Sequence, residues 1–140
     1  MRVQRLLVSA LASFALSSAA FAGSISPSMV PSEVKAAFQK QYPSAQILEW
    51  DYEDDEKAYE VEARIGKAEI DAMYSDKGEL IVSKEDVAAG AIPKDVLDEV
   101  RQKWQRAEIL GANKITTPKG ITWDIGLKIR SQYHNVKVQR

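Results

Sequence analysis

The densest group of chemically active side chains in the sequence is a run of carboxylates. Residues 51–56 read DYEDDE, so five of six positions are acidic. Carboxylates that converge on one point can hold Ca²⁺, which takes six to eight oxygen ligands. This run lacks the glycine and the spaced terminal glutamate of an EF-hand loop, and along an extended strand it would not surround a point. The pattern favours a hairpin turn with a solvated acidic rim, with a Ca²⁺ site as the alternative.

Side chains that could support catalysis are scarce elsewhere. The sequence has no Cys, a single histidine at His134, and no GxSxG, P-loop or HExxH motif, so the usual acyl-transfer, phosphoryl-transfer and zinc sites lack their parts. His134 lies beside Asn135 in a polar stretch, which predicts an exposed loop. The hypothesis of a hydrolase that uses two carboxylates stays open, but such an enzyme would need a cleft that raises the pKa of one of the two carboxyl groups. We therefore expect no catalytic residue, no metal and no cofactor, and predict that the chain is not an enzyme.

The first 22 residues have the layout of a secretory signal peptide. Arg2 and Arg5 precede an apolar run, and Ala20-Phe21-Ala22 provides a small-x-small cleavage site. We predict cleavage after Ala22 and a mature chain, residues 23–140, that is periplasmic or secreted and has no membrane span. The length of the mature chain suits one domain. Because the sequence has no Cys, no disulfide can form, and we expect packing alone to stabilise the fold.

Charge is divided unevenly between the two halves of the mature chain. Residues 31–88 carry 15 acids and 7 bases, whereas residues 89–140 carry 5 acids and 10 bases. Such asymmetry predicts oriented association with a charged partner or with a second copy of the chain. Bases at positions 101, 103 and 106 are typical of the wet face of an amphipathic helix, and export argues against a nucleic-acid partner.

The chain reads as two copies of one unit, residues 31–88 and 93–140. At an offset of 62 residues, six of 35 aligned positions are identical. Most of the identities fall on apolar periodic positions and on the prolines that precede each helix, which indicates a duplication. The identical pairs are Pro31/Pro93, Val34/Val96, Ala45/Ala107, Ile47/Ile109, Leu48/Leu110 and Lys57/Lys119.

Each unit begins with a helix and continues as antiparallel strands. Apolar residues recur at spacings of three and four after Pro31 and after Pro93, and then the period changes to two. We expect strands around residues 48–52, 59–65, 68–74 and 80–82 in the first unit, and around 108–115, 121–129 and 136–138 in the second. The predicted fold is α+β: tandem α-β-β-β units form one antiparallel sheet, with helices on one face and solvent on the other.

These motifs resemble a known family of exported bacterial proteins. The Y-x-V of Tyr59 and Val61 and the D-x-G-x-L of Asp76, Gly78 and Leu80 are similar to the hairpins of PepSY-like domains. The tandem form resembles the β-lactamase-inhibitor-like group of that family. This resemblance implies a non-enzymatic domain that binds or inhibits a protein. The second unit lacks the D-x-G turn, so the extent of its last strand is left open.

The function that we expect is binding of an exported protein or peptide, with inhibition or modulation of a periplasmic peptidase or β-lactamase as the finer hypothesis. The alternative is an envelope sensor or cation-binding protein that uses the acids at 51–56. A strand face left open to solvent is the predicted contact surface, with Trp50 as a partly exposed anchor. The predicted residues are Trp50, Glu60, Glu62, Arg64, Glu69, Asp71, Met73, Asp124, Lys128 and Arg130.

Overall fold

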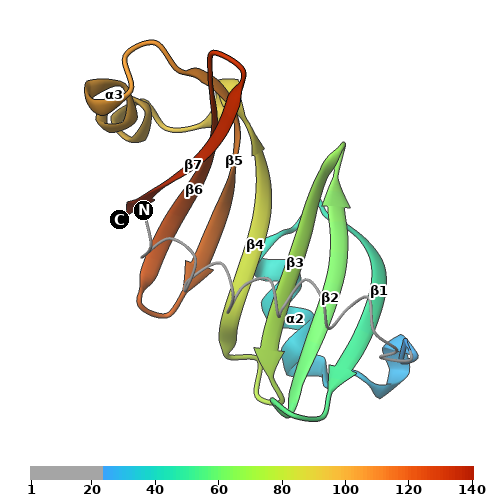
Figure 1. The fold of residues 1–140 in the computed structure, drawn as a ribbon. Helices are drawn as coiled ribbons and strands as arrows, with labels where there is room; N and C mark the ends of the chain where they lie inside the picture. Colours follow the sequence, from blue (N-terminus) through green and yellow to red (C-terminus); the bar gives the residue numbers. More distant parts are fainter. Residues whose placement is uncertain (1–23) are drawn as a thin grey trace.

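The computed structural model describes residues 24–140 and shows one open sheet of seven strands in sequence order, every neighbouring pair antiparallel (Figure 1). The predicted signal peptide lies outside the described residues. The α+β prediction is confirmed. The strands are β1 (Gln46–Glu53), β2 (Ala58–Ile65), β3 (Ala68–Ser75), β4 (Leu80–Ala88), β5 (Glu108–Thr117), β6 (Gly120–Ile129) and β7 (Gln132–Gln139). The helices are α2 (Ser32–Gln41) and α3 (Lys94–Lys103), each preceded by a short 3-10 turn, η1 (Pro27–Met29) and η2 (Ala89–Ala91).

Both α-helices pack on the same face of the sheet, and β4 shows why. Ser83 of β4 accepts a hydrogen bond from the Tyr42 hydroxyl at the end of α2, O···O 3.1 Å. Val87 of the same strand packs into the core beneath α3. Because side chains on a strand alternate between faces, Ser83 and Val87 point to the same side. The opposite face therefore has no helix over it among residues 24–140, and we call it the open face.

Two hydrophobic cores lie under the two helices. Phe38 of α2 is 1 % exposed and packs with Trp50, Val61 and Tyr74. Under α3, buried Val96 and Val100 pack against apolar side chains of β6 and β7. Each helix therefore contributes one apolar stripe to the sheet, as the spacing of its residues predicts.

The two units share local structure at the offset of 62 residues. Pro31 and Pro93 cap the two helices with φ/ψ of −53/144 and −54/140. The first strand of each unit has a register shift at matching positions, between Ile47 and Glu49 and between Ile109 and Gly111. The alignment of the two halves of the sequence leads one to expect these shared features. The gene duplication that would explain them stays a prediction.

The structure corrects the expected bounds of two strands. β4 continues to Ala88 rather than ending near Val82, because its second half pairs with β5. β7 begins at Gln132, so His134 lies in a strand and not in a loop. The His134 ring stacks on the Trp104 indole with centroids 6.0 Å apart, which places it on the helix side of the sheet. Contacts from neighbouring elements, which local polarity does not reveal, extend both strands.

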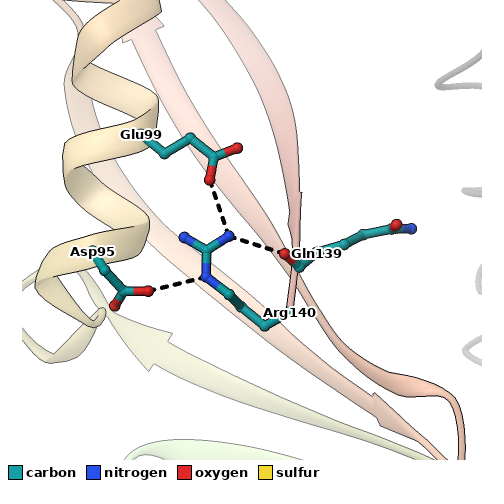
Figure 2. A network of polar contacts seen from close by, with 4 residues as sticks. All are labelled: Asp95, Glu99, Gln139 and Arg140. Carbon is teal, nitrogen blue, oxygen red and sulfur yellow. Dashed lines mark hydrogen bonds and ion pairs between the residues drawn. The ribbon is translucent and has the colours of Figure 1, made fainter.

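The last residue of the chain connects β7 to α3 (Figure 2). The Arg140 guanidinium donates from Nε to Asp95 Oδ2 at 3.0 Å and from Nη1 to Glu99 Oε2 at 2.9 Å. The same Nη1 donates to the backbone oxygen of Gln139 at 2.9 Å. The pKa of Asp95 is held below its usual range, chiefly by its hydrogen bond from Arg140. These exposed ion pairs tie the first turns of α3 to the end of the sheet.

Candidate functional site

Acidic side chains occupy adjacent positions on the open face of β1, β2 and β3. Asp51 lies directly opposite Glu60, and Glu49 lies opposite Glu62 across the β1–β2 pair. Glu62 in turn lies opposite Asp71 across the β2–β3 pair. Side chains of residues paired in this way point to the same side of a sheet, so the carboxyls gather on one surface. We call this surface the acidic face; its residues are Glu49, Asp51, Glu53, Glu60, Glu62 and Asp71.

Basic residues neutralise little of the acidic face. Like charges directly opposite each other on a sheet are destabilising. Among the ion pairs of the described residues, one reaches this surface: Lys84 Nζ lies 4.0 Å from Asp71 Oδ2. Arg64, at the end of β2, donates from Nε to Gln46 Oε1 at 3.1 Å. The acidic face therefore carries unbalanced negative charge at neutral pH.

Glu60 lies at the centre of the acidic face. It is 1 % exposed, although no helix covers this side of the sheet among residues 24–140. Burial raises the pKa of Glu60 to about 8, and the nearby carboxylates of Glu53 and Asp71 add to the shift. Its Oε2 has no hydrogen-bond partner in the described structure. The side chain is thus predominantly protonated at pH 7, an unusual state for a glutamate.

The pKa values of three other acids of the acidic face are also raised. Burial raises the pKa of Asp51, with further contributions from Glu49 and Glu53. Burial also raises the pKa of Glu62, and the charge of Asp71 adds to it. For Asp71 itself burial raises the pKa, while Lys84 acts in the opposite direction. A shared rise across neighbouring strands marks a site where added positive charge would be stabilising.

The acidic side chains of the described residues are not arranged in advance as a metal site. Within residues 24–140, no three His, Cys, Asp or Glu side chains are arranged to hold one metal ion. The three acids at the tip of the β1–β2 turn, residues 54–56, are exposed. Asp51 Oδ1 and Glu53 Oε1 are buried without a partner in the described structure, but they lie in strand β1 rather than in that turn. The acidic run is thus divided between a strand and a turn.

Several residues of the predicted contact surface do lie together on the open face. Glu60, Glu62 and Asp71 belong to the acidic face, and Arg64 pairs with exposed Glu69 across β2 and β3. Whether they contact a partner stays a prediction. Met73, expected to be solvated, is 4 % exposed and packs against Ala58 and Val82, because it lies between apolar neighbours on adjoining strands. Glu60 was also expected to be solvated and is buried.

The second unit contributes fewer of the predicted residues. Asp124 accepts a hydrogen bond at Oδ1 from Asn135 Nδ2 at 3.1 Å, and Lys128 lies 5.9 Å from the Tyr133 ring centroid. Arg130 lies beyond the end of β6, in the β6–β7 turn, with φ of 56°. It is therefore not part of the strand surface.

Trp50 was wrongly assigned to the contact surface. Its side chain is 3 % exposed and lies under α2, where its ring meets Phe38 edge to face at 6.0 Å. Alternation along β1 places Trp50 and Asp51 on opposite faces. The residues that the surface prediction omitted are Glu49, Asp51, Glu53 and Lys84. The alternation of acids at 49, 51 and 53 was the signal that could have located three of them.

Comparisons with known proteins agree with this architecture. Residues 21–82 match the model of the family described as "Putative beta-lactamase-inhibitor-like, PepSY-like". The resemblance inferred from the hairpin motifs is confirmed over that segment, which contains β1, β2, β3 and the acidic face. No curated protein matches the sequence significantly. Neither α-helix within residues 24–140 has the length and apolar character to cross a membrane.

Several solved structures with the same fold are proteins of Bacteroides species. A BLIP-like protein from Bacteroides fragilis is 13 % identical, with TM-score 0.55 over 79 % of this chain and 88 % of the other. A DUF2874 family protein from Bacteroides ovatus is 15 % identical, with TM-score 0.57 over 84 % and 82 %. A protein described as a "putative periplasmic" one from Bacteroides eggerthii is 15 % identical, with TM-score 0.55 over 79 % and 81 %. At these identities the likeness shows the fold alone.

Proposed function

We propose that this protein is a non-enzymatic binding domain of the bacterial envelope that presents its acidic face to a basic surface of another exported protein. The observation that carries this proposal is the direct opposition of acids across β1, β2 and β3. Inhibition or modulation of a periplasmic enzyme, such as a peptidase or a β-lactamase, is the finer form of the proposal.

The energetics of the acidic face favour a basic partner. The free protein keeps acids opposite one another across β1, β2 and β3, and Lys84, 4.0 Å from Asp71, supplies the one ion pair to this surface among the described residues. A partner that brings lysine or arginine side chains to this surface would relieve that repulsion and stabilise the ionised carboxylates. Complementary charge also speeds diffusional encounter. Such binding would therefore be fast at low ionic strength and would weaken as salt is added.

The family match supports the inhibitory form of the proposal. The matched family is described as β-lactamase-inhibitor-like, and a structural neighbour is described as BLIP-like. An inhibitor needs a rigid binding surface and no catalytic groups of its own. A seven-stranded sheet supported by two packed cores provides such a surface.

A charge-matched pair of variants tests the proposal. Glu62→Gln with Asp71→Asn removes two charges from the acidic face, whereas Asp54→Asn with Glu56→Gln removes two from the exposed turn. Tagged residues 23–140 would capture partners from a periplasmic extract, and captured enzymes would be assayed with and without the domain. We expect the first variant to lose the partner and the second to keep it. Equal capture by both variants would refute the proposal.

A divalent cation is the second candidate ligand, favoured by the unpartnered carboxyl oxygens of Asp51 and Glu60. Calorimetric titration with CaCl₂ at physiological salt distinguishes it from the first. Micromolar binding that Asp51→Asn abolishes would establish a cation site, and heats no larger than those of dilution would dismiss it.

A further inference from the structure

Gly126 lies in the middle of β6, and its backbone conformation does not require glycine. A glycine inside a strand weakens it and often marks a place where a ligand or another backbone approaches closely. Its φ lies outside the left-handed region, and a Cβ added there would meet nothing closer than 3.8 Å. By contrast, Gly111 opposite it has φ of +152°, and a Cβ there would lie 3.2 Å from Val87 O. The fold therefore requires Gly111 but tolerates a side chain at 126.

The absent side chain leaves a hollow on the open face, where β4 of the first unit meets the strands of the second unit. Ala88, Gly111, Gly126 and Asn135 follow one another across β4, β5, β6 and β7. Two glycines and one alanine in a row expose the peptide planes of three neighbouring strands. The hollow above them has a volume of about 440 Å³. Its floor is thus flat, apolar and about two strand spacings wide, or roughly 10 Å.

The rim of the hollow is polar and rich in acceptors. Asp86, Asn113 and Asp124 form the next row across β4, β5 and β6 and line one side. The exposed side chain of Leu110 and the Lys67 side chain from the β2–β3 turn complete the walls. An occupant that fits has a flat apolar body and a hydrogen-bond donor at its tip.

We propose that this hollow binds one aromatic side chain, tryptophan or tyrosine, of the protein partner. The ring lies on the Gly111–Gly126 floor, and its N–H or O–H donates to a carboxylate of the rim. A leucine fills less of the floor and supplies no donor for Asp86 or Asp124. That the ring belongs to a protein partner rests on the proposed function. The hollow and the acidic face lie on the same side of the sheet, the open face.

Interfaces between proteins favour such an arrangement. Buried aromatic anchors in well-formed recesses dominate binding energy, with charged pairs around them that steer and orient the partner. Here the recess lies where the two units meet, and the opposed acids lie in the first unit. A partner with an aromatic residue beside a basic patch would contact both units at once.

The test uses nuclear magnetic resonance of isotope-labelled residues 23–140 with two small probes. N-acetyl-tryptophanamide carries the ring and the donor, and N-acetyl-leucinamide serves as the apolar probe without them. Gly126→Val fills the hollow, and a β-branched residue suits a strand, so the variant is expected to fold with an equal or higher Tm. Thr122→Val, on the same face of β6 but outside the hollow, is the matched control.

We expect saturable shifts of the Gly111 and Gly126 amides with the tryptophan probe alone, retained in Thr122→Val. In Gly126→Val the corresponding shifts around the hollow are lost. Equal shifts with both probes, or shifts that persist in Gly126→Val, would overturn the proposal. For a captured partner, Gly126→Val should weaken binding by roughly tenfold or more. If Glu62→Gln with Asp71→Asn still captures the partner, the proposed function is refuted. If the partner binds Gly126→Val as tightly as the unchanged protein, the aromatic site is refuted and the proposed function is not.

Discussion

Both units begin with a helix that precedes antiparallel strands, four in the first unit and three in the second, but they attach their helices differently. In the first unit, α2 is held by aromatic packing and by a partly buried hydrogen-bond network. In this network the Tyr74 hydroxyl donates to Gln41 Oε1 at 2.7 Å, and Gln41 Nε2 donates to Ser83 Oγ at 3.2 Å. In the second unit, α3 packs through valines and is tied to the chain end by the exposed ion pairs of Arg140.

The open faces of the two units differ as well. The first carries opposed carboxylates, and the second carries the glycine floor of the hollow. The two units therefore share local backbone structure but not one surface, because no helix packs on the open face among residues 24–140. The core under α2 lies on the other side of the strands that carry these carboxylates.

The largest expected effect comes from the aromatic core of the first unit. Phe38→Ala should lower the free energy of unfolding by about 4 kcal/mol, because the Phe38 ring contacts Tyr42, Trp50 and Tyr74 with centroids 5.4, 6.0 and 6.4 Å away. Its aligned counterpart, Val100→Ala, should cost about 2 kcal/mol, since a smaller side chain is removed. Urea denaturation measures both. Equal losses would contradict the unequal anchoring of the two helices.

The next effect concerns the pH dependence of stability. Glu60 has a folded-state pKa of about 8 against 4.5 for the ordinary side chain. Between those values the folded state holds a proton that the unfolded chain releases, so stability falls as pH rises through this window. Glu60→Gln removes the effect and should be more stabilising at pH 9 than at pH 5 by up to about 4 kcal/mol, since each pH unit within this window is worth about 1.4 kcal/mol.

Urea denaturation at the two pH values checks this, with Glu56→Gln in the exposed turn as a charge-matched control. A gain from Glu60→Gln that is the same at both pH values would show that Glu60 does not hold a proton in the folded state.

A smaller loss is expected from the polar network under α2. Tyr74→Phe removes the donor to Gln41 and should cost about 1 kcal/mol, the usual net worth of one hydrogen bond. Tyr133→Phe, where the side chain is 71 % exposed, serves as the control and should be neutral. Thermal unfolding of the two variants makes the comparison, and a loss as large in Tyr133→Phe would contradict it.

The smallest effect is expected at the chain end. Arg140→Ala breaks the ion pairs with Asp95 and Glu99, which are exposed and therefore weak. The Tm should fall slightly at low ionic strength, and the difference should vanish at 1 M NaCl because salt screens exposed charges. A salt-independent fall would instead indicate that Arg140 supports α3 through packing.

Local pattern was sufficient to predict most of the elements. The change from a helical to a strand period, the capping prolines and the glycine of the β3–β4 turn are local signals, and Gly78 does adopt a positive φ of 80°. The ends of β4 and β7 were not predictable in this way. Their added length comes from pairing with β5 and β6, which depends on residues far along the chain.

The sequence by itself determined which residues face the helices, because alternation along a strand is a local property: Val61 and Trp123 are buried where their period places them. It also determined that the first unit is acidic. Only the tertiary structure decided that Glu60 loses solvent and that Gly126 opens a hollow. These outcomes depend on which strands lie side by side and in which register, and register is fixed by the whole sheet rather than by any one segment.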